Sequence, residues 1–238
     1  MPEQTIALTS VKAVIFDMDG TLYRQASLRR AMAVRLVRAH LLRPRHGLRM
    51  VRVLSAYRRA QEDLRATAGQ TDLADAQLRL AAERTGVDQD EVARCVEHWM
   101  DAAPLPLLAR FGQPGMSDAL HTLRSWGLRL AVLSDYPVTA KLDALGIADL
   151  FDVVLCAQEP EIGVFKPNPR GLEVALERLG ISAADALYVG DRADIDAVAA
   201  AAAHIPCAIL GASGPAGSDD GFVRITSFQD MQERLEPR

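Results

Sequence analysis

VIFDMDGTLY, the stretch from Val14 to Tyr23, joins an apolar run to a pair of carboxylates. The run Val14–Phe16 has the composition of a buried strand, and Asp17, Asp19 and a glycine follow it directly. Because side chains alternate along an extended chain, Asp17 and Asp19 emerge on the same side. Carboxylates this close repel each other and raise a pKa, and a divalent cation removes that conflict. A solvated acidic turn stays open for these residues alone.

A helical period follows this stretch. Between Ser27 and Met100 apolar residues recur three or four positions apart, which predicts about four helices and no strands. Breaks are expected at Arg43–Gly47, at Ala68–Gln70 and at Gly86. The segment Ala102–Gly115 is rich in proline and glycine, so we interpret it as a linker that returns the chain to the first domain.

Beyond that linker, short apolar runs alternate with helical segments. The expected strands are Leu128–Leu133, Asp152–Cys156, Ala186–Val189, Ile205–Leu210 and Val223–Ile225, and the expected helices are Val138–Leu145, Leu172–Leu179 and Ile195–Ala203. The segment Gly211–Gly221 is expected to be a surface loop. The fold class is therefore α/β, a doubly wound Rossmann-like parallel sheet with an all-helical insert after its first strand. We divide the chain into an α/β core, 1–22 and 110–238, and a helical cap domain, 23–109.

Composition limits the class of protein. The 238 residues are 49% hydrophobic with a formal net charge of −4, which fits one large domain plus an insert. The cysteines Cys95, Cys156 and Cys207 lie far apart and indicate neither a disulfide framework nor a metal site. No apolar run reaches the roughly 18–20 residues of a membrane span. We expect a cytoplasmic protein with no membrane association, either a monomer or a homodimer.

Polar residues follow the other predicted strands, at the edge where open α/β sheets bind ligands. Ser134 and Asp135 follow the second run, and Gly190 through Asp196 (GDRADID) follows the fourth. A serine there can donate to an oxyanion or cap the next helix, and acids in a first helical turn can simply favour its dipole. Asp191 is the acid best placed to meet the pair on the first strand.

Lysines are rare in this chain: of 27 basic residues only Lys12, Lys141 and Lys166 are lysines. Lys166 stands in the proline-rich segment FKPNP, which indicates a compact point charge aimed at a phosphate or carboxylate. A solvated loop lysine stays open. Together the strand ends offer carboxylates, a hydroxyl and a lysine, a set that suits Mg²⁺ beside a phosphoryl group and covalent transfer to an aspartate.

Four segments, in order, resemble the motifs of the haloacid dehalogenase superfamily. They are DMDGTL (Asp17–Leu22), Ser134, Lys166 before its proline, and GDRADID (Gly190–Asp196). The resemblance covers the whole chain. It implies a central five-stranded parallel sheet, with the helical insert as a C1-type cap between the first and second motifs.

The resemblance also implies roles. Asp17 is expected to be the nucleophile, and Asp19 to protonate the leaving group and then activate water. Ser134 and Lys166 are expected to hold the phosphoryl oxygens. The expected Mg²⁺ ligands are Asp17, the backbone carbonyl of Asp19, Asp191, and Asp196 through water, the last preferred over Asp194. Gly20, Thr21 and Asp135, which adjoin these motifs, are expected to contact substrate.

Position 19 separates activities within the superfamily, because cleavage of carbon–halogen bonds needs no general acid there. Asp19 therefore favours a phosphatase that hydrolyses a small phosphomonoester. A phosphomutase or phosphotransferase with the same aspartyl-phosphate is the alternative.

The insert carries an excess of positive charge. Between Arg24 and Arg65 twelve arginines face two acids, Glu62 and Asp63. Most are expected on a solvated face, and Arg24 and Arg58 (or Arg59) are expected to bind a second anionic group of the substrate. A non-catalytic module with a basic helical surface is a further alternative, but between Arg24 and Met100 the insert holds only two aromatics, Tyr57 and Trp99, so no nucleic-acid partner is expected.

Overall fold

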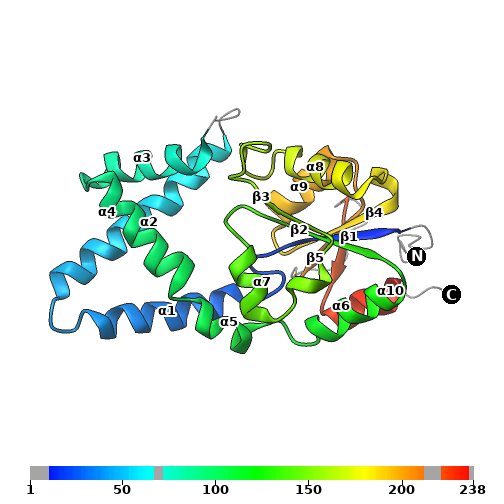
Figure 1. The fold of residues 1–238 in the computed structure, drawn as a ribbon, viewed down its shortest axis with the longest axis horizontal. Helices are drawn as coiled ribbons and strands as arrows, with labels where there is room; N and C mark the ends of the chain where they lie inside the picture. The colour runs from blue at the N-terminus through cyan, green and yellow to red at the C-terminus, as the bar shows by residue number, and fades with distance from the viewer. Residues whose placement is uncertain (1–10, 67–71, 212–220, 236–238) are drawn as a thin grey trace.

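A six-stranded, fully parallel sheet forms the centre of the protein, which we describe from a computed structural model for residues 11–66, 72–211 and 221–235. The strands are β1 (Ala13–Asp17), β2 (Arg129–Ser134), β3 (Val153–Cys156), β4 (Ala186–Gly190), β5 (Cys207–Leu210) and β6 (Val223–Ile225). Their order is β3-β2-β1-β4-β5-β6, so β1 lies between β2 and β4 (Figure 1). The register pairs Asp17 with Leu133, which brings the ends of β1 and β2 to one edge.

Helices cover both faces of this sheet (Figure 1). Ala13 and Ile15 pack with α8 (Arg170–Leu179) and α9 (Val198–Ala202), whereas Val14 and Phe16 pack with α6 (Met116–Ser125) and α10 (Phe228–Leu235). Alternate residues of β1 thus enter opposite cores, which explains why the strand is apolar from Ala13 to Phe16. The predicted doubly wound α/β fold is confirmed.

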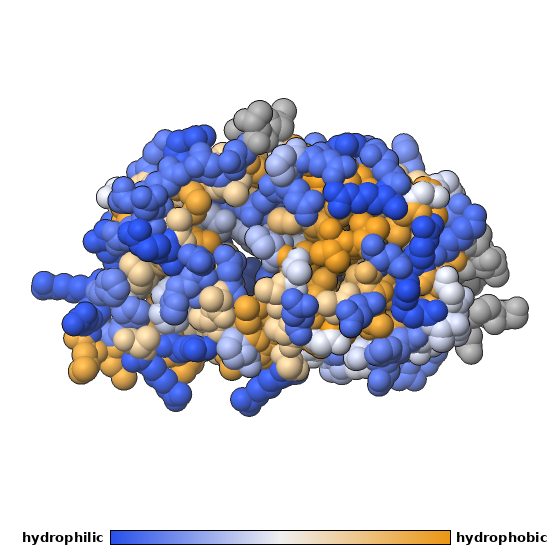
Figure 2. All heavy atoms as spheres, viewed as in Figure 1, coloured by the Kyte–Doolittle hydropathy of each residue, from blue (hydrophilic) through white to orange (hydrophobic). Residues whose placement is uncertain are grey.

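The helical insert forms a lobe beside the sheet (Figure 1). Its helices are α1 (Gln25–Ala39), α2 (Pro44–Arg65), α3 (Leu73–Thr85) and α4 (Gln89–Val96), followed by a π-helix (Glu97–Ala102) and α5 (Leu105–Phe111). The lobe has its own core, in which Val53, Tyr57, Ala81, Val92 and Cys95 are buried. At the tip where α1 and α2 meet, apolar side chains are exposed, Leu42 by 97% (Figure 2).

Shorter elements complete the described residues. They are α7 (Thr139–Leu145), a second π-helix (Ala193–Ala197), and 3₁₀ turns at Ala148–Leu150 and Ala183–Asp185. None of the helices described is long and apolar enough to cross a membrane. The predicted break at Ala68–Gln70 and the interior of the predicted loop Gly211–Gly221 fall on residues outside the described ranges.

One prediction needs correction. The segment Ala102–Gly115 is not only a linker, because α5 occupies Leu105–Phe111. Pro104 and Pro106 lie at the start of that helix, where a missing N–H breaks no intrahelical bond. The six strands agree with the predicted sheet of about five, and the predicted strand Val223–Ile225 is β6, at one edge of the sheet.

Candidate functional site

Most of the predicted residues line one cavity of about 270 Å³ at the carboxyl edge of the sheet. Its lining includes Asp17, Asp19, Lys166, Asp191 and Asp196. These residues come from the end of β1, the loop before α8 and the segment after β4. The space-filling view is hollowed between the two lobes (Figure 2). Segments far apart in the sequence therefore supply one site.

Lys166 stands at the centre of the site. Its buried Nζ donates to Asp17 Oδ1 at 2.5 Å, to Asp196 Oδ1 at 2.7 Å and to the Tyr188 hydroxyl at 2.9 Å. Burial works to lower the pKa of Lys166, but Asp17 and Asp196 outweigh it and hold that pKa well above its ordinary value. The ammonium is therefore a fixed positive charge beside two carboxylates.

The pKa values of the two carboxylates paired with Lys166 shift in opposite directions. Burial raises the pKa of Asp17 well above its ordinary value, and Asp196 and Asp191 add to this effect although Lys166 opposes it. Burial would raise the pKa of Asp196 too, but Lys166 and the backbone N–H of Arg192 outweigh burial and lower that pKa below its ordinary value. Metal-free Asp17 therefore lacks sufficient positive charge nearby, and a cation would supply it.

Three carboxylates form a cluster suited to a metal ion. Oxygen atoms of Asp17, Asp191 and Asp196 all lie within 4.8 Å of one another. Burial, followed by repulsion from Asp196, raises the pKa of Asp191 to about 6. A Cβ on Gly20, where φ is +114°, would lie 2.0 Å from Asp191 Oδ2, so only glycine allows this approach. A ligand set made only of carboxylate oxygens fits a hard divalent cation such as Mg²⁺.

The fourth motif offers two outer carboxylates, and the structure brings only Asp196 into the cluster. Asp196 is 1% exposed, and its Oδ2 accepts from the backbone N–H groups of Asp191 at 3.2 Å and Arg192 at 3.0 Å. The Asp194 side chain is 68% exposed and pairs with the Arg192 guanidinium at 2.7 Å. Asp196 is therefore the one of the two acids that lies in the cluster, and its role as the outer metal ligand stays a prediction.

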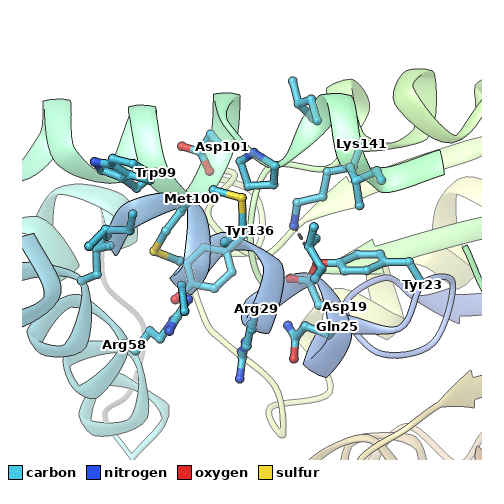
Figure 3. Close-up of a pocket in the computed structure, with 18 of the residues that line it drawn as sticks. Asp19, Tyr23, Gln25, Arg29, Arg58, Trp99, Met100, Asp101, Tyr136 and Lys141 are labelled. Atoms are coloured by element: carbon cyan, nitrogen blue, oxygen red, sulfur yellow. Dashed lines mark hydrogen bonds and ion pairs between the residues drawn. The ribbon is translucent and has the colours of Figure 1, made fainter. Parts of the chain in front are cut away.

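Asp19 lies apart from this cluster, with its side chain toward the helical lobe. Its Oδ1 accepts a hydrogen bond from Lys141 Nζ at 2.7 Å and another from the Tyr23 hydroxyl (Figure 3). Burial would raise the pKa of Asp19, but Lys141, with Tyr23, outweighs burial and lowers it. Lys141 was not predicted as a site residue, although its rarity in an arginine-rich chain was a usable signal.

Three other predicted residues make hydrogen bonds next to the cavity without lining it. Ser134 is buried at the end of β2, and its hydroxyl oxygen accepts from the Tyr136 backbone N–H at 3.2 Å. The Thr21 hydroxyl donates to Asp17 Oδ2 at 3.1 Å. Gly20 accepts at its carbonyl oxygen from the Gln113 amide at 2.9 Å. Thr21 therefore orients the carboxylate of Asp17.

Asp135 connects the helical lobe to the sheet. Its Oδ2 accepts from Arg65 at 2.7 Å and from Gln61 at 3.1 Å, both on α2, and its Oδ1 accepts from the Lys166 backbone N–H at 3.3 Å. Both carboxylate oxygens are thus occupied by protein groups. Sequence reasoning missed Arg65 and Gln61, because nothing local marks a residue of α2 as a partner of β2.

The insert arginines divide into two groups. Arg58, on α2, lines the cavity as predicted, and so does Arg59. Arg24 does not, because its side chain donates to the Arg110 carbonyl at 3.2 Å. Arg29 on α1 lines the cavity instead and was missed. Burial and repulsion from Arg29 lower the pKa of Arg58.

Known proteins resemble this chain over most of its length. A family model for haloacid dehalogenase-like hydrolases matches residues 11–204. The chain is 32% identical to the glyceraldehyde 3-phosphate phosphatase of Methanopyrus kandleri, covering 94% of this chain and 88% of that protein. It is 31% identical to the phosphoglycolate phosphatase of Rhodospirillum rubrum, covering 84% and 79% respectively.

Solved structures show the same fold. A 2-haloacid dehalogenase from Pseudomonas syringae pv. Tomato matches with a TM-score of 0.68 at 21% identity, covering 94% of this chain and 98% of that one. A HAD phosphatase from Thermococcus onnurineus matches with a TM-score of 0.64 at 22% identity, covering 96% and 99%. The sheet, the helical insert, the ordered motifs and these matches agree, and the chain belongs to the haloacid dehalogenase-like hydrolase family.

Proposed function

We propose that this hydrolase is a Mg²⁺-dependent phosphatase that acts on a small phosphomonoester through an aspartyl-phosphate. The observation that carries the proposal is that Asp17 and Asp19, two residues apart, have different partners in the site. Asp17 lies beside Lys166 and the acidic cluster, whereas Asp19, two residues on, is held apart by Lys141. This separation supports the proposal that Asp17 attacks phosphorus and that Asp19 transfers the proton. Relatives named as phosphatases support this proposal.

The first step forms a bond between an Asp17 oxygen and phosphorus while the bond from phosphorus to the leaving oxygen breaks. Asp19 gives its proton to that oxygen, which departs as an alcohol. Asp19 then takes a proton from water, and the resulting hydroxide attacks the aspartyl-phosphate, releasing inorganic phosphate and restoring Asp17. Because its pKa is lowered, Asp19 is ionised in the free protein. The arriving substrate must therefore either carry the proton to Asp19 or, through its negative charge, raise the pKa of Asp19 so that it binds one.

Asp17, Asp191 and Asp196, with the Asp19 carbonyl, would hold Mg²⁺. When bound, the ion supplies positive charge for the nucleophile and the phosphoryl oxygens. Lys166 supplies a second charge there and Thr21 orients Asp17. Ser134 is proposed as a phosphoryl ligand through its hydroxyl, which already accepts one hydrogen bond and has its proton free to donate.

Residues 23–109 are proposed as the cap domain that selects the substrate. Arg58 is proposed to bind a second anionic group near the ester, with Arg29 in place of Arg24 as its partner, because both line the cavity beside Asp19. These arginines lie on α2 and α1, so the arrangement of the two helices sets the distance from the reacting phosphate.

The test is phosphate release over a panel of phosphomonoesters, with and without Mg²⁺. Wild type should release phosphate from some members only with the ion, and Asp17→Asn should release none. Asp194→Asn is the matched control, because Asp194 carries the same side chain on the same segment but is exposed, and it should keep most of the activity. If wild type and Asp17→Asn were equally inactive on every ester, including generic chromogenic ones, the proposal would be refuted.

A further inference from the structure

A second cavity, of about 280 Å³, opens inside the helical lobe (Figure 3). It lies among α1, α2, the π-helix Glu97–Ala102 and α5. Its lining is mainly apolar and includes Leu28, Met32, Leu36, Leu54, Trp99 and Met100. Its volume is near the lower limit of ordinary small-molecule sites, roughly 300–1,000 Å³.

This cavity adjoins the catalytic one. The two share Asp19, Gln25, Arg29, Arg58, Gln61 and Tyr136 as lining residues. Asp19 therefore stands at the junction, with the acidic cluster and Lys166 on one side and the apolar chamber on the other. Because Asp19 is the proposed proton donor to the leaving oxygen, a substrate with its phosphorus at Asp17 directs its alcohol portion into the chamber.

The wall facing α1 and α2 is built by an irregular helix. The π-helix places three consecutive residues, Trp99, Met100 and Asp101, along the chamber (Figure 3). In a regular α-helix successive side chains point about 100° apart, so three consecutive residues do not share one face. π-Helical turns are rare, and they occur frequently at functional sites. An indole ring and a thioether are soft, polarisable groups that contact a flat apolar ligand well.

Charged groups meet the chamber mainly where it joins the catalytic cavity. Arg29 and Lys141 lie near Asp19, Arg58 lines both cavities, and Asp101 stands on the π-helix side (Figure 3). A two-carbon acid such as glycolate, held beside Asp19, would leave the apolar walls uncovered. A ring or branched alkyl body would cover Trp99, Met100 and Leu54 and remove them from water.

We infer that the leaving group of the substrate is an alcohol with an apolar body about the size of a ring, bound in this chamber. The inference rests on the proposed function, since it identifies the chamber from the position of the proton donor. The inferred substrate differs from phosphomonoesters whose leaving group is a short hydroxy acid such as glycolate.

The test compares two esters of equal intrinsic reactivity, 2-phenylethyl phosphate and ethyl phosphate. Both release primary alcohols, so a difference in kcat/KM reports the ring alone. Burying roughly 100 Å² of apolar surface predicts a preference of about tenfold or more for the phenylethyl ester. A wild-type ratio near one would overturn the inference even if both esters were hydrolysed, and the proposed function would stand.

Two variants locate the effect. Ala33 and Ala39 are both exposed alanines on α1, but only Ala33 lines the chamber. Ala33→Trp should reduce the preference for the phenylethyl ester to about threefold or less, because an indole occupies the space, and Ala39→Trp should keep it. A preference that survived Ala33→Trp unchanged would place the ring elsewhere.

A binding measurement covers the case of no turnover. 3-Phenylpropylphosphonate and propylphosphonate replace the ester oxygen by carbon and cannot be hydrolysed at that bond. Calorimetric titration with Mg²⁺ present should give about tenfold tighter binding of the phenyl compound to wild type and to Ala39→Trp, but not to Ala33→Trp. Equal binding of the two phosphonates to wild type would refute the inference, whereas tighter phenyl binding without hydrolysis of any ester would refute only the proposed function.

Discussion

Replacement of Lys166 by methionine tests how the site balances its charge. The methionine side chain is similar in length but removes the ammonium that Asp17 and Asp196 share at 2.5 and 2.7 Å. Both ion pairs are buried, with side chains no more than 7% exposed. Removing one partner of a buried pair destabilises a protein by about 3–5 kcal/mol. For a chain of this size the melting temperature should fall by roughly 6–20 °C.

The pH dependence follows from what limits this loss. Without Lys166 an aspartate can avoid being buried as an unpaired charge by binding a proton. Protonating a carboxyl group of ordinary pKa costs ~4 kcal/mol at pH 7 but only ~1.5 kcal/mol at pH 5. A carboxyl group whose folded pKa lies above its unfolded pKa gives the folded state more protons, so the variant gains stability as the pH falls from 7 to 5. The difference from wild type should therefore shrink over that interval.

Urea unfolding in the absence of Mg²⁺, at pH 5 and pH 7, measures the effect. Lys12→Met is the matched control, because it removes an ion pair whose lysine side chain is 64% exposed and should leave the unfolding midpoint nearly unchanged at both values. If Lys166→Met lost equal stability at pH 5 and pH 7, the loss would come from packing, and the charge-balance reasoning would be wrong.

Three further predictions concern the metal cluster and the proton donor. Gly20→Ala should weaken Mg²⁺ binding by about tenfold or more in calorimetric titration, because its Cβ would collide with Asp191. Gly86→Ala, also at positive φ but with nothing within 4 Å, should bind the ion like wild type. Mg²⁺ affinity of wild type should fall as the pH drops below about 6, where Asp191 holds a proton that the ion must displace; constant affinity from pH 5 to 8 would contradict this. Lys141→Met should lower kcat/KM by roughly 10- to 100-fold, because Asp19 loses a hydrogen bond that holds it, and should move the alkaline limb of its pH profile upward, because Lys141 helps to lower the pKa of this proton donor; an unmoved limb would exclude that role.

The sheet was predictable because its strands are short, apolar and separated by helical segments. Val14–Phe16 and Ala186–Val189 are buried on both faces, so their composition alone indicates parallel strands. The helix in Ala102–Gly115 was missed because a proline in a first helical turn has the same sequence signature as a proline that ends a helix. The π-helix Glu97–Ala102 has no local signal that separates it from the end of α4.

The site was predictable to the extent that its residues follow strands. Asp17, Lys166 and Asp191 each lie in a segment whose position in an α/β sheet is known from chain order. Lys141 lies on α7 of the core and Arg29 on α1 of the insert, and no local pattern encodes which residues of a helix reach the site. The rarity of lysine marked Lys141, whereas nothing distinguishes Arg29 from the other eleven arginines between Arg24 and Arg65.

The central claim is that Asp17 forms a covalent bond to phosphorus, and trapping that intermediate tests it directly. Wild type mixed with substrate and Mg²⁺ and quenched within one turnover should be reduced by borohydride to homoserine at position 17, as identified by peptide mass spectrometry. Asp19→Asn, which keeps the nucleophile but lacks the base for the second step, should accumulate at least as much of this product from an ester with a good leaving group. Hydrolysis that proceeds with no reducible aspartate at position 17, or with the modification at another residue, would contradict the mechanism.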